Sequence, residues 1–195
     1  MTRRTAVILA IGVVAIASTW FLLRALQRGD RSQPTGGPVN PASAAAATGQ
    51  KITATLYFVS EDGLSLAGVR REVPFSEDVF DQARHVLEAQ LGPAPEPFVS
   101  AIPSGTTLRS LYLTERGDAF VDLSADARTK HTGGSIDELF TVYAIVDALT
   151  VNLPAITRVQ ILVEGKEVDT LAGHVDLRHP LQKNLQWVRA EKDES

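Results

Sequence analysis

The chain has 195 residues, a formal net charge of −4 and no cysteine. This length is enough for one ordinary domain with additional segments. The absence of cysteine excludes disulfides and lipid attachment through a cysteine side chain. All but one of the acidic residues lie in residues 51–195, and so acidic a domain argues against a nucleic-acid partner.

Residues 5–23 form one long uncharged run bracketed by arginines. At about 1.5 Å per residue, a helix of this length spans roughly 28 Å, close to the hydrocarbon thickness of a bilayer. We therefore expect a signal anchor at residues 1–28, with a transmembrane helix over 5–23. Because Ala15 and Ala17 resemble a cleavage site, a cleaved signal peptide is the alternative. Both readings carry the rest of the chain across a membrane.

Positive charges are nearly balanced on the two sides of this run, so the charge rule alone does not set its orientation. A long folded domain is translocated largely regardless of its charges. We therefore expect a single-pass protein of the cytoplasmic (inner) membrane with its C-terminal domain on the extracytoplasmic side. Residues 29–50 are rich in Pro, Gly, Ser and Ala and predict a flexible linker, with a root-mean-square span of roughly 25 Å.

Strand and helix patterns alternate along the rest of the chain. They predict strands at 53–60, 64–73, 107–113, 119–123, 159–163 and 168–171, and helices at 77–91 and 135–151. Ser135 and Glu138 have the spacing of a capping box at the start of the second helix. The element order predicts an α+β fold in which two helices pack on one face of a mixed five- to six-stranded sheet, preceded by the transmembrane helix and a disordered linker.

Four short motifs follow one another within residues 51–180. They are Ile102-Pro103-x-Gly105-Thr106, Val121-Asp122-Leu123-Ser124, Glu164-Gly165 and Gly173-His174-x-Asp176-Leu177. In this order they resemble the landmarks of the GerMN domain of sporulation and spore-germination proteins, present here in a single copy. The resemblance implies a compact domain similar to the ring-building motifs of envelope machines, with a non-enzymatic role in the envelope. We expect no cofactor. It implies structural roles for Pro103, Gly105, Asp122, Ser124, Gly165, Gly173, His174 and Asp176.

Three histidine and aspartate residues near the end of this region could present ligands to a metal. His174 and Asp176 would share one face of a strand, and His179 follows them. The helical His pair and catalytic Glu of a hydrolytic zinc site do not accompany them in the sequence. We therefore expect hydrogen-bonded structural roles and no metal at these positions.

Two further patterns have both a chemical and a structural interpretation. Asp122 and Ser124 could join a histidine in a nucleophile arrangement, but the sequence contains no G-x-S-x-G elbow, and Ser124 suits a turn or a helix cap. The sequence Gly133-Gly134-Ser135 could expose backbone N–H groups to an anion at a helix start, or serve as a flexible joint.

Residues 181–195 predict an amphipathic tail, with Leu181, Leu185 and Val188 on one helical face. The tail either folds back on the domain or offers a surface to a partner. For the whole protein we expect a non-enzymatic module that assembles with envelope proteins or with itself and is attached to the membrane through its N-terminal helix. The alternatives are a cell-wall or small-ligand binding module that uses the proline-rich loop after the first helix, and a metal-dependent hydrolase.

Overall fold

The computed structural model describes residues 49–189. In chain order its elements are β1 (Lys51–Val59), β2 (Leu66–Pro74), α3 (Val79–Gln90), β3 (Leu108–Leu113), β4 (Asp118–Leu123), α4 (Asp126–Thr129), α5 (Ser135–Asn152), β5 (Arg158–Val163), β6 (Lys166–Glu167), β7 (Leu181–Gln182) and the 3-10 turn η1 (Leu185–Trp187).

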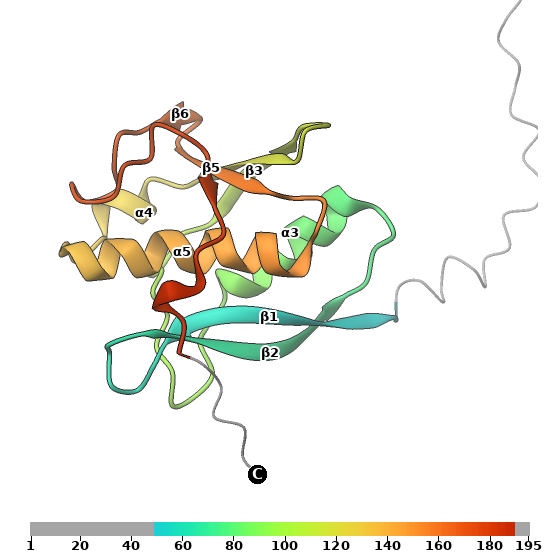
Figure 1. Ribbon diagram of the computed structural model, residues 1–195, viewed down its shortest axis with the longest axis horizontal. Coiled ribbons are helices and arrows are strands. Elements are labelled where there is room, and N and C mark those ends of the chain that lie inside the picture. Colours follow the sequence, from blue (N-terminus) through green and yellow to red (C-terminus); the bar gives the residue numbers. More distant parts are fainter. Residues whose placement is uncertain (1–48, 190–195) are drawn as a thin grey trace, which may run out of the picture. The chain divides into compact units, whose positions relative to one another are not determined.

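The strands form two separate sheets with the long helices between them (Figure 1). One sheet is the antiparallel hairpin of β1 and β2. The other is mixed and runs in the order β3-β4-β5-β6, with β4 and β5 parallel and β7 added to β5. Because β4 and β5 are parallel, the chain must cross over between them, and α5 provides that crossover.

Helix α5 is buried on two opposite sides. This explains why the fold has three layers, which are the hairpin, the helices and the mixed sheet. Phe140, Ala144 and Ala148 recur every four residues and pack against the hairpin. Val142, Ile145, Val146 and Leu149 lie on the other side and pack against the mixed sheet. A helix with apolar residues around most of its circumference is stable only when both sides are covered. The hairpin and the mixed sheet cover them here.

The outer edge of β1 is closed by contacts from other elements. The side-chain amide of Gln90 accepts the Tyr57 N–H at 2.8 Å and donates to the Tyr57 carbonyl at 2.7 Å. Asn152 bonds the N–H and carbonyl of Thr55 in the same way, at 2.8 and 2.7 Å. At the end of the strand, Val59 pairs with Val99. These contacts satisfy an edge that would otherwise be open to another strand.

The predicted α+β class and mixed sheet agree with the structure, but three predictions need correction. The hairpin does not belong to the mixed sheet, because α5 separates the two. Residues 168–171 are not a strand, since the short strand after β5 is Lys166–Glu167. The predicted transmembrane helix is not found: within residues 49–189 no helix is long and apolar enough to cross a membrane, and residues 5–23 lie outside the described part.

Residues 181–189 lie against the domain as the short strand β7 and the 3-10 turn η1, and not as an α-helix. Leu181 pairs with Val159 in β7, and the Asn184 N–H donates to Asp147 Oδ1 at 2.9 Å. The Arg189 N–H donates to the Leu66 carbonyl at 2.8 Å. These contacts hold the segment across α5 and the end of β2.

Candidate functional site

The carboxyl ends of β4 and β5 bring two of the sequence motifs together. Asp122 is buried near the end of β4, and its Oδ1 accepts the Gly165 N–H at 2.7 Å. Gly165 and Glu164 both have positive φ angles, 73° and 54°, as the two central residues of a tight turn between β5 and β6 require. Arg109 Nη1 lies 3.6 Å from Asp122 Oδ2 and 3.4 Å from Glu164 Oε2. The aspartate therefore fixes the turn after the neighbouring strand.

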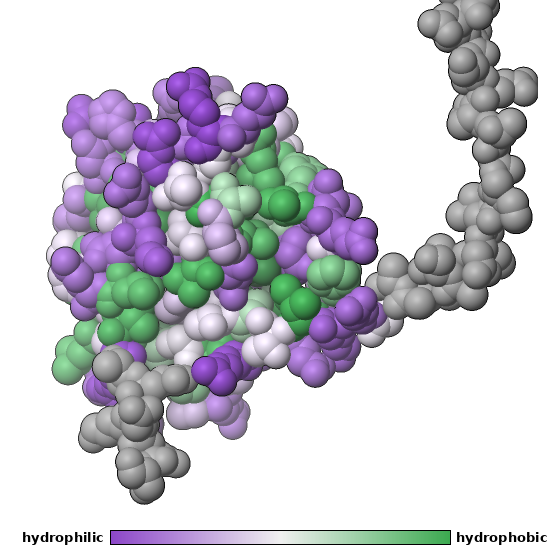
Figure 2. Space-filling model, turned by 45° about the vertical axis from the view of Figure 1, so that its right-hand side comes forward, coloured by the Kyte–Doolittle hydropathy of each residue, from purple (hydrophilic) through white to green (hydrophobic). Residues whose placement is uncertain are grey.

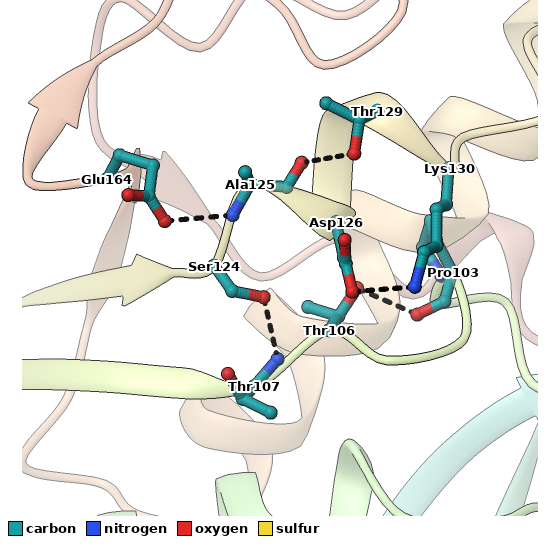
Figure 3. A network of polar contacts seen from close by, with 9 residues as sticks. All are labelled: Pro103, Thr106, Thr107, Ser124, Ala125, Asp126, Thr129, Lys130 and Glu164. Carbon is teal, nitrogen blue, oxygen red and sulfur yellow. Dashed lines mark hydrogen bonds and ion pairs between the residues drawn. The ribbon is translucent and has the colours of Figure 1, made fainter.

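Ser124 joins the end of β4 to the chain that enters β3 (Figure 3). Its Oγ accepts the Thr107 N–H at 3.0 Å, and its own N–H donates to the Thr107 carbonyl at 3.0 Å. Beside it, Glu164 Oε1 accepts the Ala125 N–H at 3.0 Å, at the start of α4. Within residues 49–189 no histidine bonds the Ser124 hydroxyl, so the described structure contains no serine–histidine pair here.

Gly105 allows the loop before β3 to lie against α4. Its φ is +85°, and a Cβ at this position would lie 2.6 Å from Asp126 Oδ2 and 2.8 Å from Lys130 Nζ. Those two groups form an ion pair at 2.8 Å (Figure 3). Two residues earlier, the Pro103 carbonyl accepts the Thr106 hydroxyl at 2.7 Å, which closes the turn. The backbone angle therefore requires glycine here, whereas a Cβ would meet only the ends of two flexible side chains.

Glu138 is the centre of a second cluster, in the first turn of α5. Its side chain is fully buried. Oε1 accepts the Leu171 and Ala172 N–H groups at 2.7 and 2.9 Å, and Oε2 accepts the His174 N–H at 2.7 Å. Burial by itself would raise the pKa of this carboxyl, but the backbone N–H groups together outweigh burial and hold the pKa below its usual value.

This cluster corrects the predicted capping box. The N-cap of α5 is Gly134, and it makes no side-chain cap bond. Ser135 is the first helical residue, and Glu138 turns away from it to hold the loop that contains Gly173 and His174. The Gly-His motif therefore supplies the His174 N–H to a buried carboxylate, beside the Leu171 and Ala172 N–H groups that precede the motif.

The three residues considered for a metal do not form a metal site in the described structure. Asp176 forms two side-chain bonds with Arg178, at 2.9 and 2.7 Å, and these bonds hold the pKa of Asp176 well below its usual range. The His174 and His179 side chains are exposed. In the described part of the chain, no group of three His, Asp or Glu residues is arranged to hold a metal ion.

The glycine-rich start of α5 makes one contact that bears on anion binding. The Gly133 N–H donates to His131 Nδ1 at 3.0 Å. Because Nδ1 is the acceptor there, Nε2 carries the proton in neutral His131 and faces the Thr141 hydroxyl at 3.1 Å. One of the N–H groups considered for an anion is thus already used. The two interpretations of this start, an anion site and a flexible joint, both stay open.

Two hollows lie beside these clusters. One, of about 550 Å³, is lined by α4 and the β5–β6 turn, including Arg128, Glu164 and Lys166. Hydrophilic residues gather at the top of Figure 2, at the height where Figure 1 places β6. The other, of about 500 Å³, lies between the loop at residues 99–104 and the start of α5, with Phe140 among its lining residues.

Asp147 was not singled out from the sequence. It is fully buried; its Oδ1 accepts the Asn184 N–H at 2.9 Å, and its Oδ2 has no hydrogen-bond partner within the described residues. Burial raises its pKa to about 6, against the lowering effects of the Asn184 N–H and Lys183. One signal could have found it, because it is the only charged residue between Leu139 and Asn152.

Comparisons with known proteins bear on the family and the fold of this chain. The family model for sporulation and spore germination, named Germane, matches residues 55–169. The chain belongs to this family. The resemblance predicted from the sequence motifs is thereby confirmed. The first three motifs lie inside the matched region, and the fourth, which begins at Gly173, follows it. No curated protein matches the chain.

Two solved structures share the fold of this Germane-family chain. The first GerMN domain of the sporulation protein GerM from Bacillus subtilis has 21% identity and a TM-score of 0.50, over 68% of this chain and 96% of that one. The tandem GerMN domains of the same protein have 18% identity and a TM-score of 0.51, over 70% of this chain. This chain matches 46% of the tandem structure. At these identities the likeness concerns the fold.

Proposed function

We propose that this chain is a non-enzymatic module of the cell envelope that assembles with other envelope proteins or with copies of itself. One observation carries the proposal: the polar groups of the family motifs are used to hold the domain together. Asp122 holds the β5–β6 turn, Ser124 holds the entry to β3, and the His174 backbone holds Glu138. These contacts stabilise the fold and, among the described residues, leave the motif side chains without a catalytic arrangement. A stable surface is what an assembly module needs for binding a partner.

An extracytoplasmic location is part of this proposal. The uncharged run at residues 5–23 supports export, since an anchor and a cleaved signal peptide share this feature. The acidic charge of the rest of the chain supports protein partners over nucleic acid.

Exposed apolar side chains suggest where partners bind. Val99 and Tyr112 are 62% and 59% exposed, on the loop before β3 and on β3 itself. Large apolar residues that remain this exposed are common at protein interfaces.

Photocrosslinking in the cells that make the protein tests the proposal. A photoreactive amino acid would replace Val99 or Tyr112 in the full chain, and Glu61 at the exposed β1–β2 turn would serve as the control position. We expect discrete adducts with envelope proteins, or with the chain itself, from Val99 or Tyr112 and not from Glu61. Adducts no stronger than the control at both positions would count against the proposal.

A second candidate is a binding module for a cell-wall or small ligand, and the hollow beside the loop at residues 99–104 favours it. Ile102 and Phe140 line this hollow together with Lys130, His131 and Asp137, so it combines apolar and polar groups as ligand sites do. Retention of the full chain on purified cell wall would support this function. A chain that elutes with the unbound fraction would argue against cell-wall binding.

A further inference from the structure

We propose that the free edge of β2 is a docking surface for a second copy of this chain, strand against strand. The inference rests on the proposed function, because it names the chain itself as one partner of the assembly module. It begins from a difference between the two edges of the hairpin. The edge of β1 is closed by Gln90, Asn152 and Val99, whereas no residue from 49 to 189 covers most of the β2 edge.

The hairpin register determines which groups face outward from β2. Thr55 and Tyr57 direct their backbone groups away from β2, so the ladder between the strands uses the intervening residues of β1. On β2 the same alternation turns the N–H and carbonyl groups of Gly68, Arg70 and Glu72 outward. Within residues 49–189 no other group bonds these backbone atoms, and the Arg70 and Glu72 side chains are exposed.

One end of this edge already accepts a strand-like contact. Val188 forms an isolated bridge with Leu66, and the Arg189 N–H donates to the Leu66 carbonyl at 2.8 Å. Leu66 is one of the alternate residues of β2 whose backbone groups point away from β1. Beyond Leu66, the next outward groups are those of Gly68, Arg70 and Glu72.

Charge selects a second copy and one register for it. Two antiparallel copies of β2 related by a twofold axis can be centred on Arg70, Arg71 or Glu72. Centring on Arg70 places two guanidinium groups opposite each other, and centring on Glu72 does the same for two carboxylates. Centring on Arg71 places Arg70 of each copy opposite Glu72 of the other, which gives two favourable pairs of opposite charge across the strands. It also places the two Arg71 side chains opposite each other, as a single pair of like charges. The edge is therefore complementary to itself in that register.

The charged neighbours of this edge are compatible with the Arg71-centred register. Each Arg71 is held by its own domain, since its Nη1 donates to the Pro93 carbonyl at 3.0 Å and its guanidinium lies 5.7 Å from the centre of the Phe58 ring. Glu72 also pairs with Lys51 at 2.9 Å, through one carboxylate oxygen at an exposed site. Its other oxygen stays available to Arg70 of the second copy. Arg70 itself has no ion-pair partner in the described part of the chain.

Cysteine crosslinking of the full chain in detergent micelles tests the register. Because the chain has no cysteine, one introduced thiol reports one position. In the proposed register the two copies of residue 71 form a non-hydrogen-bonded pair, with Cα atoms about 4.5 Å apart, within disulfide range. We expect Arg71→Cys to form a disulfide dimer under mild oxidation and Val69→Cys, on the same face of β2, to remain monomeric. Equal crosslinking at both positions, or none at either, would overturn the proposal.

A charge swap tests the same register without a thiol. Arg70→Glu alone, or Glu72→Arg alone, places like charges opposite each other, and we expect about ten-fold weaker self-association by analytical ultracentrifugation. The double variant Arg70→Glu/Glu72→Arg restores opposite charges and should regain association close to that of the wild type. A wild-type chain that stays monomeric, or a double variant as weak as the singles, would overturn the proposal. Adducts from Val99 or Tyr112 to other envelope proteins would then leave the proposed function standing.

Discussion

Glu138 and His174 are joined by a 2.7 Å hydrogen bond between a buried carboxylate and a backbone N–H, across 36 residues of sequence. The Leu171 and Ala172 N–H groups bind the same carboxylate. One side chain on α5 thus fixes the loop that contains the last family motif. We expect this loop to depend on the charge of Glu138 more than on its size.

Glu138→Gln should lower the free energy of unfolding by about 2–3 kcal/mol at pH 7, because an amide has the same shape but turns an NH₂ group toward a backbone donor. The folded pKa of Glu138 is below its unfolded value, so its stabilising effect is present above about pH 4.5 and is lost as the pH falls through the folded pKa. Urea unfolding from pH 3 to 8 should therefore show the two stability curves converging in acid. Asp137→Asn, at the exposed neighbouring residue, is the control and should change little.

Asp147→Asn should stabilise the protein at neutral pH. The folded carboxyl keeps its proton up to about pH 6, whereas the unfolded one loses it near 3.8, so the folded state binds more protons between these values. Wild-type stability therefore falls as the pH rises from about 4 to 6. A shift of this size corresponds to a gain of about 3 kcal/mol for the variant above pH 6, with little gain below pH 4. A variant that is less stable than the wild type at pH 7 would contradict this account.

Gln90→Met should lower the free energy of unfolding by about 2–4 kcal/mol. The substitution keeps the size of the side chain but leaves the N–H and carbonyl of Tyr57 without partners in a buried place. Gln186→Met makes the same chemical change at an exposed position and should alter stability by less than about 0.5 kcal/mol. Chemical denaturation of both variants measures the difference, and equal losses would show that the bonds to Tyr57 do not stabilise the fold.

Gly117→Ala should destabilise the protein more than Gly63→Ala. Both glycines have positive φ, 82° and 72°, so both substitutions strain the backbone by roughly 1–2 kcal/mol. Only at Gly117 would the new Cβ meet backbone, 2.7 Å from the Ala155 carbonyl oxygen. We expect an additional loss of about 1–3 kcal/mol for Gly117→Ala in thermal or urea unfolding. Similar losses for the two variants would mean that the loop at Ala155 moves aside easily.

Sequence periodicity predicted most of the elements because it is a local property. Alternation of apolar residues placed five strands, and the apolar stripes placed both long helices. It could not place the hairpin relative to the other strands, because whether two strands share a sheet depends on what lies between them. The apolar residues on both sides of α5 indicate that two layers cover this helix. The sequence does not say which strands form each layer, and the structure shows that the hairpin covers one side and the mixed sheet the other.

The sequence by itself determined the family, the acidic charge of the domain, the helices and the alternation of the main strands, since these depend on residue identity and short spacing. Only the tertiary structure decided which polar groups meet. Glu138 binds backbone N–H groups more than 30 residues away, and Gln90 closes the edge of β1 through backbone atoms of Tyr57. Backbone donors and acceptors are the same at nearly every residue, so no sequence pattern marks which of them a distant side chain will bind.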